Sequence, residues 1–130
     1  MIGIWNTHAQ TFMLVFSILA MVVFVIPMIF APMFWARMLL WNIPDDTDLA
    51  VYSLRSLGSL GLAVLLITFR AAITGEGLLL VYEMFVPFFA LMVLVHLYGA
   101  IRKIQPVTET LEIGFWLVLL VLALCFMPAA

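Results

Sequence analysis

Four long apolar runs occupy most of this 130-residue chain, and each is bounded by the few charged residues in the sequence. A helix rises about 1.5 Å per residue, so it needs about 20 apolar residues to cross roughly 30 Å of hydrocarbon. Each run is close to that length and is therefore predicted to be a membrane-spanning helix. The predicted spans are residues 11–31, 51–73, 78–101 and 111–127.

The composition excludes a water-soluble helical bundle. Hydrophobic residues make up 68% of the chain and charged residues 9%, against about 45–50% and 25% in ordinary globular domains. These numbers leave too few polar side chains to cover a surface in water. The predicted fold class is an all-α integral membrane four-helix bundle with short loops, forming a single transmembrane domain over residues 1–130.

Charge and cysteine content exclude two further classes of protein. A net charge of -2 with only five lysines and arginines provides no basic surface for nucleic acid. The single cysteine, Cys125, cannot form an intramolecular disulfide or a dithiol relay and is expected to be a small buried hydrophobe. The first run has no basic residues before it and no small-residue cleavage site, which favours a mature span over a signal peptide.

The connections predict how the helices follow one another. Pro27 should bend the first span without ending it. Residues 31–41 fit either a short helix in the headgroup region or an extension of the first span. The acids after Pro44 mark a solvated turn without the pattern of a calcium loop, and the glycines around Glu76 predict a tight antiparallel hairpin.

Basic residues near the ends of the spans predict the orientation. Arg70 is the only basic residue expected on the side of the membrane that carries the second connection, whereas four basic residues are expected on the side of the first and third connections. Both termini are therefore expected on the non-cytoplasmic side, in a bacterial cytoplasmic (inner) membrane. The four residues expected on the cytoplasmic side are Arg37, Arg55, Arg102 and Lys103.

Ionisable residues inside the spans are costly in a bilayer and need partners. From the expected depths, Arg55 should form a structural ion pair with Glu112, with His96 beside them. At the other end, hairpin geometry pairs Arg70 with Glu83. Each layer could either clamp the helices together or contribute to a ligand site.

His96 is the candidate cofactor-binding residue, because a neutral imidazole in an apolar helix can ligate haem iron or a pigment metal. The alternative is a hydrogen-bonded histidine near the interface. The only other histidine, His8, lies in the terminal segment, which argues against bis-histidine haem. Glu83 and His96 are too far apart in one helix for a Glu-x-x-His motif, so no metal site is predicted.

Small residues along the second span predict close packing against another helix. The first span, by contrast, is bulky and carries no acidic residue, which argues against proton-coupled export of the small four-helix type. No catalytic triad, paired cysteines or phosphate-binding glycine loop can be assembled, so no catalytic residue is predicted and enzymatic activity is not expected. The predicted packing residues are Ser56, Gly58, Ser59, Gly61 and Ala63.

Two short segments resemble a known group of proteins. The segment Tyr52 to Gly58 places Arg55 early in a helix that continues to Gly61, and residues 95–99 read Val-His-Leu-Tyr-Gly. Together with four short-looped spans, they resemble the DoxX-like small bacterial membrane proteins. Some members of that group look like membrane subunits associated with redox enzymes, so the resemblance implies an accessory or anchoring role.

Two functional hypotheses follow. The first is an accessory or structural subunit that packs within a larger membrane complex, such as a redox or energy-converting one, or against copies of itself. The second is a binding protein or transporter for a hydrophobic ligand near His96, Arg55 and Glu112. Such a ligand would be a quinone, a lipid or a pigment. A third class is a membrane enzyme that uses these three residues for acid/base chemistry.

Overall fold

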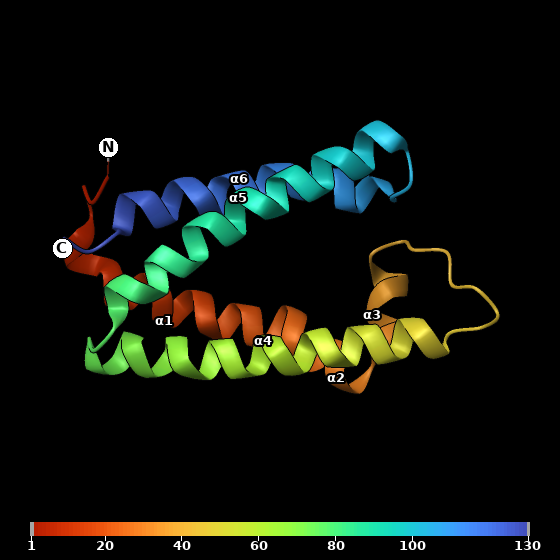
Figure 1. The fold of residues 1–130 in the computed structure, drawn as a ribbon, viewed down its shortest axis with the longest axis horizontal. Coiled ribbons are helices and arrows are strands. Elements are labelled where there is room, and N and C mark those ends of the chain that lie inside the picture. Colours follow the sequence, from red (N-terminus) through yellow and green to blue (C-terminus); the bar gives the residue numbers. More distant parts are fainter. Residues whose placement is uncertain (1, 130) are drawn as a thin grey trace.

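The computed structural model describes residues 2–129, and within them every regular element is helical. The long helices form two pairs (Figure 1). One pair contains α1 (Ala9–Ala20) and α4 (Asp48–Thr74), and the other contains α5 (Leu78–Arg102) and α6 (Val107–Phe126). This confirms the predicted all-α class. The four helices long and apolar enough to span a membrane are Asn6–Phe30, Asp48–Thr74, Leu78–Arg102 and Val107–Phe126.

The first span is continuous but irregular. It comprises a 3-10 turn at Asn6–His8, α1 (Ala9–Ala20), a π-helical stretch at Met21–Val25 and α2 (Ile26–Phe30). Pro27 lies inside it, and the helix continues past the proline as predicted.

The proline leaves one backbone carbonyl of the first span without its helical partner. Pro27 has no N–H group to bond with the carbonyl of Val23. The indole Nε1 of Trp35 donates to that carbonyl instead, at 2.8 Å. A side chain from the next helix therefore replaces the missing hydrogen bond.

Residues 31–41 contain a separate short helix, α3 (Pro32–Met38). The backbone leaves the helical region at Ala31, where φ is -139° and ψ is 53°. Pro32 then begins α3, because a residue without an N–H group is well tolerated in the first helical turn. Of the two alternatives for this segment, the structure supports a distinct helix.

The remaining helices form an antiparallel arrangement. The hairpin between α4 (Asp48–Thr74) and α5 (Leu78–Arg102) turns on Gly75 and Gly77, both with positive φ. Helix α6 (Val107–Phe126) packs mainly on α5, whereas α4 packs mainly on α1 and α2.

The N-terminal segment closes the bundle at the end where both termini lie (Figure 1). Gly3 and Trp5 donate backbone hydrogen bonds to the carbonyls of Leu124 and Cys125, each at 2.9 Å. These bonds satisfy carbonyls at the C-terminal end of α6 that have no helical partner.

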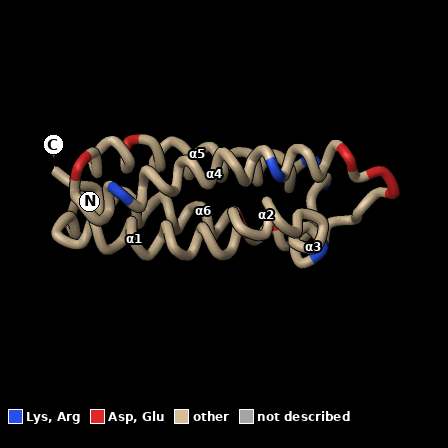
Figure 2. Tube along the Cα trace, turned by 90° about the horizontal axis from the view of Figure 1, so that it is seen from below, with Lys and Arg blue, Asp and Glu red and all other residues tan. Residues whose placement is uncertain are grey.

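Charged residues gather near the two ends of the bundle, and the long middle carries almost none (Figure 2). Such a distribution matches apolar helices that contact the lipid bilayer with their charges near the headgroups.

Candidate functional site: a polar trio at the head of an apolar cavity

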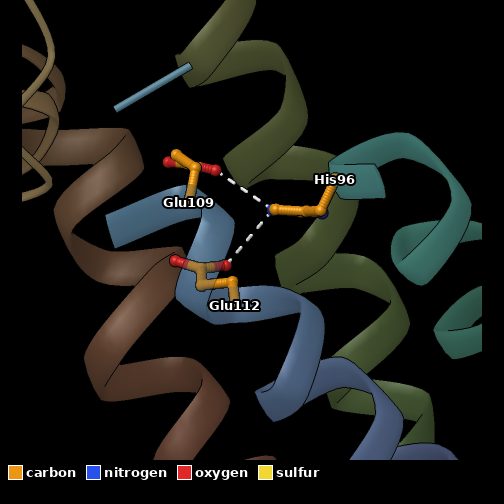
Figure 3. A group of neighbouring side chains, drawn as sticks. All are labelled: His96, Glu109 and Glu112. Atoms are coloured by element: carbon orange, nitrogen blue, oxygen red, sulfur yellow. Dashed lines mark hydrogen bonds and ion pairs between the residues drawn. The ribbon is translucent and has the colours of Figure 1, made fainter. Parts of the chain in front are cut away.

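Three ionisable side chains converge where α5 ends and α6 begins (Figure 3). The Nε2 atom of His96 lies 3.0 Å from Oε2 of Glu109 and 3.4 Å from Oε2 of Glu112. The two glutamates are three residues apart on α6 and therefore share one helical face. We call these three residues the polar trio.

The trio is largely shielded from the surroundings. The exposed side-chain fractions are 6% for His96, 15% for Glu109 and 18% for Glu112. Charges with so little exposure are screened weakly, so their mutual interactions are strong.

Hydrogen bonding fixes which nitrogen of His96 carries a proton. Its Nδ1 atom lies 2.8 Å from the carbonyl oxygen of Met92. A carbonyl can only accept, so Nδ1 must donate. In the neutral imidazole, Nε2 would then be an acceptor facing two carboxylates. The trio therefore requires a further cation among its donor atoms, either a proton or a metal ion.

Two tryptophans hold the carboxylates in place. The Nε1 atom of Trp41, in the loop after α3, donates to Oε1 of Glu109 at 2.8 Å. The Nε1 atom of Trp116 donates to Oε2 of Glu112 at 3.1 Å. The short turn between α5 and α6 is held as well, because Gln105 donates to the backbone carbonyl of His96 at 3.0 Å.

An apolar cavity of about 370 Å³ lies against the trio, enclosed by the first span, Trp35 and helices α4, α5 and α6. His96, Glu109 and Glu112 all form part of its wall. Most of the remaining wall is aliphatic or aromatic. Its aromatic residues include Phe16, Phe24, Phe85, Phe88, Phe115 and Trp116.

The cavity reaches the outer surface of the bundle. Leu57 and Leu60 of α4 and Met84 and Phe88 of α5 line it, and all four side chains are exposed. The opening therefore lies between the two helical pairs, on a surface that faces lipid in a membrane. A molecule dissolved in the bilayer could reach the cavity without crossing water.

The expected pair of Arg55 and Glu112 is not found. Glu112 pairs with His96, and Arg55 lies on the exposed face of α4. The physical reason is the helix order, because α6 packs on α5 and not on α4. His96 contacts Glu112, and Glu109 is a second acid beside it.

The expected pair of Arg70 and Glu83 is also replaced. Arg70 donates to Glu76 at 3.0 Å, and both side chains are 74% exposed. The hairpin loop carrying Glu76 is closer to the end of α4 than the exposed Glu83 is. An ion pair with so much exposure contributes little to stability.

The predicted packing residues of α4 divide into two groups. An added Cβ at Gly58 would lie 2.8 Å from Cγ1 of Ile29, and one at Gly61 would lie 3.1 Å from Cγ2 of Val25. These two glycines allow α4 to approach the first span closely. The other three residues, Ser56, Ser59 and Ala63, are exposed.

Glu109 was missed as a site residue because an acidic residue in the first turn of a helix is favourable in its own right and indicates no particular partner. The helix begins at Val107, so Glu109 belongs to its first turn. The available signal was the spacing of Glu109 and Glu112, which places two carboxylates on one face close to the expected depth of His96. His8 lies in the 3-10 turn at the start of the first span, at the opposite end of the bundle, and does not contact the trio.

No protein-family model, curated protein or solved structure matches this chain. The resemblance to the DoxX-like group is therefore unconfirmed and extends to the four-span architecture alone. The fold and the site define a class, namely a small integral membrane protein with four spanning helices and a polar trio at the head of an apolar cavity.

Proposed function

We propose that this protein binds a lipophilic molecule of the quinone class in the cavity. The observation that carries this proposal is the placement of His96, Glu109 and Glu112 at one end of an otherwise apolar, aromatic cavity. Ligand pockets commonly combine an apolar wall with a few convergent polar groups. The ring would lie among the phenylalanines, with one of its oxygens directed at the trio.

The charge of the trio favours a neutral ligand over an anionic lipid. Two carboxylates face the cavity, and no lysine or arginine between residues 2 and 129 forms an ion pair with either. A phosphate or fatty-acid carboxylate would meet like charges at low dielectric, which is unfavourable. A quinone carries no net charge and avoids this repulsion.

The bonding of His96 disfavours a pigment. Axial ligation of a tetrapyrrole needs an unengaged imidazole nitrogen. Nδ1 of His96 is bonded to Met92, and Nε2 faces the two glutamates, so its lone pair is directed at carboxylates where a macrocycle would have to lie. A quinone oxygen can accept a hydrogen bond from a carboxyl group of the trio when that group carries the proton, and the contact of Nδ1 with Met92 stays in place.

Equilibrium dialysis of the detergent-solubilised protein against a short-tailed benzoquinone in detergent-matched buffer tests the proposal. Leu57 lies at the rim of the cavity and is 55% exposed, whereas Leu66 is 58% exposed on the same helix and does not line the cavity. We expect saturable binding that Leu57→Trp weakens by about tenfold or more, which corresponds to about 1.4 kcal/mol.

The matched variant Leu66→Trp should bind as the unmodified protein does. Equal losses in both variants would show that the quinone partitions into the detergent or onto the general apolar surface. The absence of any saturable component would refute the proposal.

The accessory-subunit hypothesis takes second place. Its support is the apolar outer surface of the helices, where large side chains such as Leu49, Leu80 and Leu94 are exposed. Lipid covers such a surface as well as a partner subunit does. Mass measurement of the intact particle after gentle extraction tests it, because an accessory subunit should travel with other polypeptides.

A further inference from the structure

We infer that His96, Glu109 and Glu112 form a binding site for a first-row divalent transition-metal ion, such as Zn²⁺. Sequence patterns did not predict this site, because its ligands come from two different helices. The inference does not depend on the quinone proposal, since the ion would be held by protein atoms alone.

The donor atoms have spacings that suit such an ion. Tetrahedral coordination with bonds of about 2.0–2.2 Å places donor atoms about 3.3–3.6 Å apart. Nε2 of His96 lies 3.0 Å from Glu109 and 3.4 Å from Glu112, and one donor from each residue falls within 4.8 Å of the others. The two distances from Nε2 are within a few tenths of an ångström of that range, and the carboxylate oxygens would complete the arrangement by small rotations of their side chains.

The protonation of His96 leaves the correct nitrogen for a metal. Nδ1 donates to the carbonyl of Met92, so the lone pair of Nε2 points toward the glutamates. Histidines that bind metals commonly donate their second N–H to a backbone carbonyl or carboxylate in this way. The tautomer is therefore fixed by the helix that carries the residue.

The carboxylates are oriented by groups that would not compete for the ion. Trp41 and Trp116 donate indole N–H bonds to Glu109 and Glu112. An indole nitrogen can only donate, so it positions a carboxylate without acting as a ligand.

The charge of the trio also calls for a cation. Two carboxylates and the Nε2 lone pair meet at a poorly exposed point, and no lysine or arginine in the described part of the chain forms an ion pair with them. A divalent ion would neutralise both carboxylates. A single proton shared with His96 is the competing solution, and it leaves one negative charge uncompensated.

The donor types select the class of ion. One imidazole and two carboxylates suit zinc, iron or manganese, whereas copper(I) prefers sulfur ligands. Calcium takes six to eight oxygen ligands, more than two carboxylates supply. Because the trio lines the cavity, a fourth coordination position would face the cavity and could accept an oxygen from a bound ligand.

The test is Zn²⁺ binding to chelator-treated protein in detergent, measured by equilibrium dialysis and elemental analysis without quinone. We expect about one tightly bound ion per chain, as for a single site with three protein ligands. His96→Ala should abolish this binding, and Glu109→Gln should weaken it by more than about 100-fold, beyond the range for indirect partners. Glu83→Gln, at an exposed carboxylate on the same α5 helix, should leave it unchanged.

A milder variant keeps the test valid if His96→Ala does not fold. Trp41→Phe keeps an aromatic ring but removes the N–H group that bonds Glu109, and it should weaken Zn²⁺ binding by about 10- to 100-fold. Substituting Co²⁺ should give the visible absorption of a low-coordinate site with nitrogen and oxygen ligands. Absence of Zn²⁺ binding at micromolar concentration, or equal binding by His96→Ala and the unmodified protein, would overturn the inference.

The two proposals fail in distinguishable ways. Quinone dialysis is performed on chelator-treated protein, and metal dialysis is performed without quinone. Loss of Zn²⁺ binding with retained quinone binding would reject the metal site alone, and the reverse result would reject the quinone proposal alone.

Discussion

At the residue scale, His96 connects the two glutamates to the rest of the bundle. It contacts both carboxylates through one nitrogen and its own helix through the other. Removing its side chain leaves two poorly exposed carboxylates beside each other without a compensating cation. Breaking such an arrangement costs more than the loss of a surface pair.

We therefore predict that His96→Ala lowers the free energy of unfolding by about 2–4 kcal/mol, measured by denaturation in detergent. Adding Glu109→Gln and Glu112→Gln should recover most of that loss, because the uncompensated charges are removed. Arg55→Ala, at an exposed residue, should change stability by less than about 0.5 kcal/mol. A larger effect for Arg55→Ala than for His96→Ala would contradict the assigned pairing.

Residue pairings were the part of the site that sequence reasoning could predict least. Depth along each span correctly suggested that His96 and Glu112 approach each other. Depth does not reveal which helices are neighbours, so Arg55 was paired with an acid on a helix that does not pack against its own. Helix order within a membrane bundle depends on packing of apolar faces, which a uniform hydrophobic run does not encode.

At the element scale, the close approach of α4 to the first span depends on Gly58. An added Cβ would lie 2.8 Å from the Ile29 side chain and 3.1 Å from Cβ of Met28. Both distances are too short for ordinary van der Waals contact, so the two helices would have to separate.

We predict that Gly58→Leu lowers the free energy of unfolding by about 1–3 kcal/mol through overpacking. The control is Gly114→Leu on α6, where nothing lies within 4 Å of an added Cβ. Thermal denaturation in detergent should show a lower melting temperature only for Gly58→Leu. Equal shifts for both variants would indicate a general cost of replacing glycine.

The existence of the spans was predictable because hydropathy and length decide it. The ends were less predictable, since polar residues in the first or last turn of a helix interrupt an apolar run without ending the helix. The last predicted span began at residue 111, whereas α6 begins at Val107. Glu109 lies in this first turn, where an acid is favourable without any partner, so its contact with His96 could not be predicted.

At the scale of the whole molecule, the positions of the charges define the two ends of the bundle (Figure 2). The end with the polar trio also carries most of the basic residues, including Arg102 and Lys103. The positive-inside rule predicts that this end faces the cytoplasm. We thus propose that the head of the cavity lies near the cytoplasmic headgroups.

Cysteine labelling tests this orientation. In a Cys125→Ala background, we predict that a membrane-impermeant maleimide labels Glu76→Cys in intact cells. Asp46→Cys, in the loop at the opposite end, should react only after lysis. Both positions are exposed in the structure, so access depends on the side of the membrane. The reverse pattern would invert the proposed topology.

We propose that the cavity beneath the polar trio holds a lipophilic molecule of the quinone class in the cell. The most direct measurement is mass spectrometry of the organic extract from protein isolated in mild detergent, compared between the unmodified protein and Leu57→Trp. We expect a quinone that accompanies the unmodified protein and is depleted in the variant. An extract that contains only membrane lipids, in equal amounts from both, would contradict it.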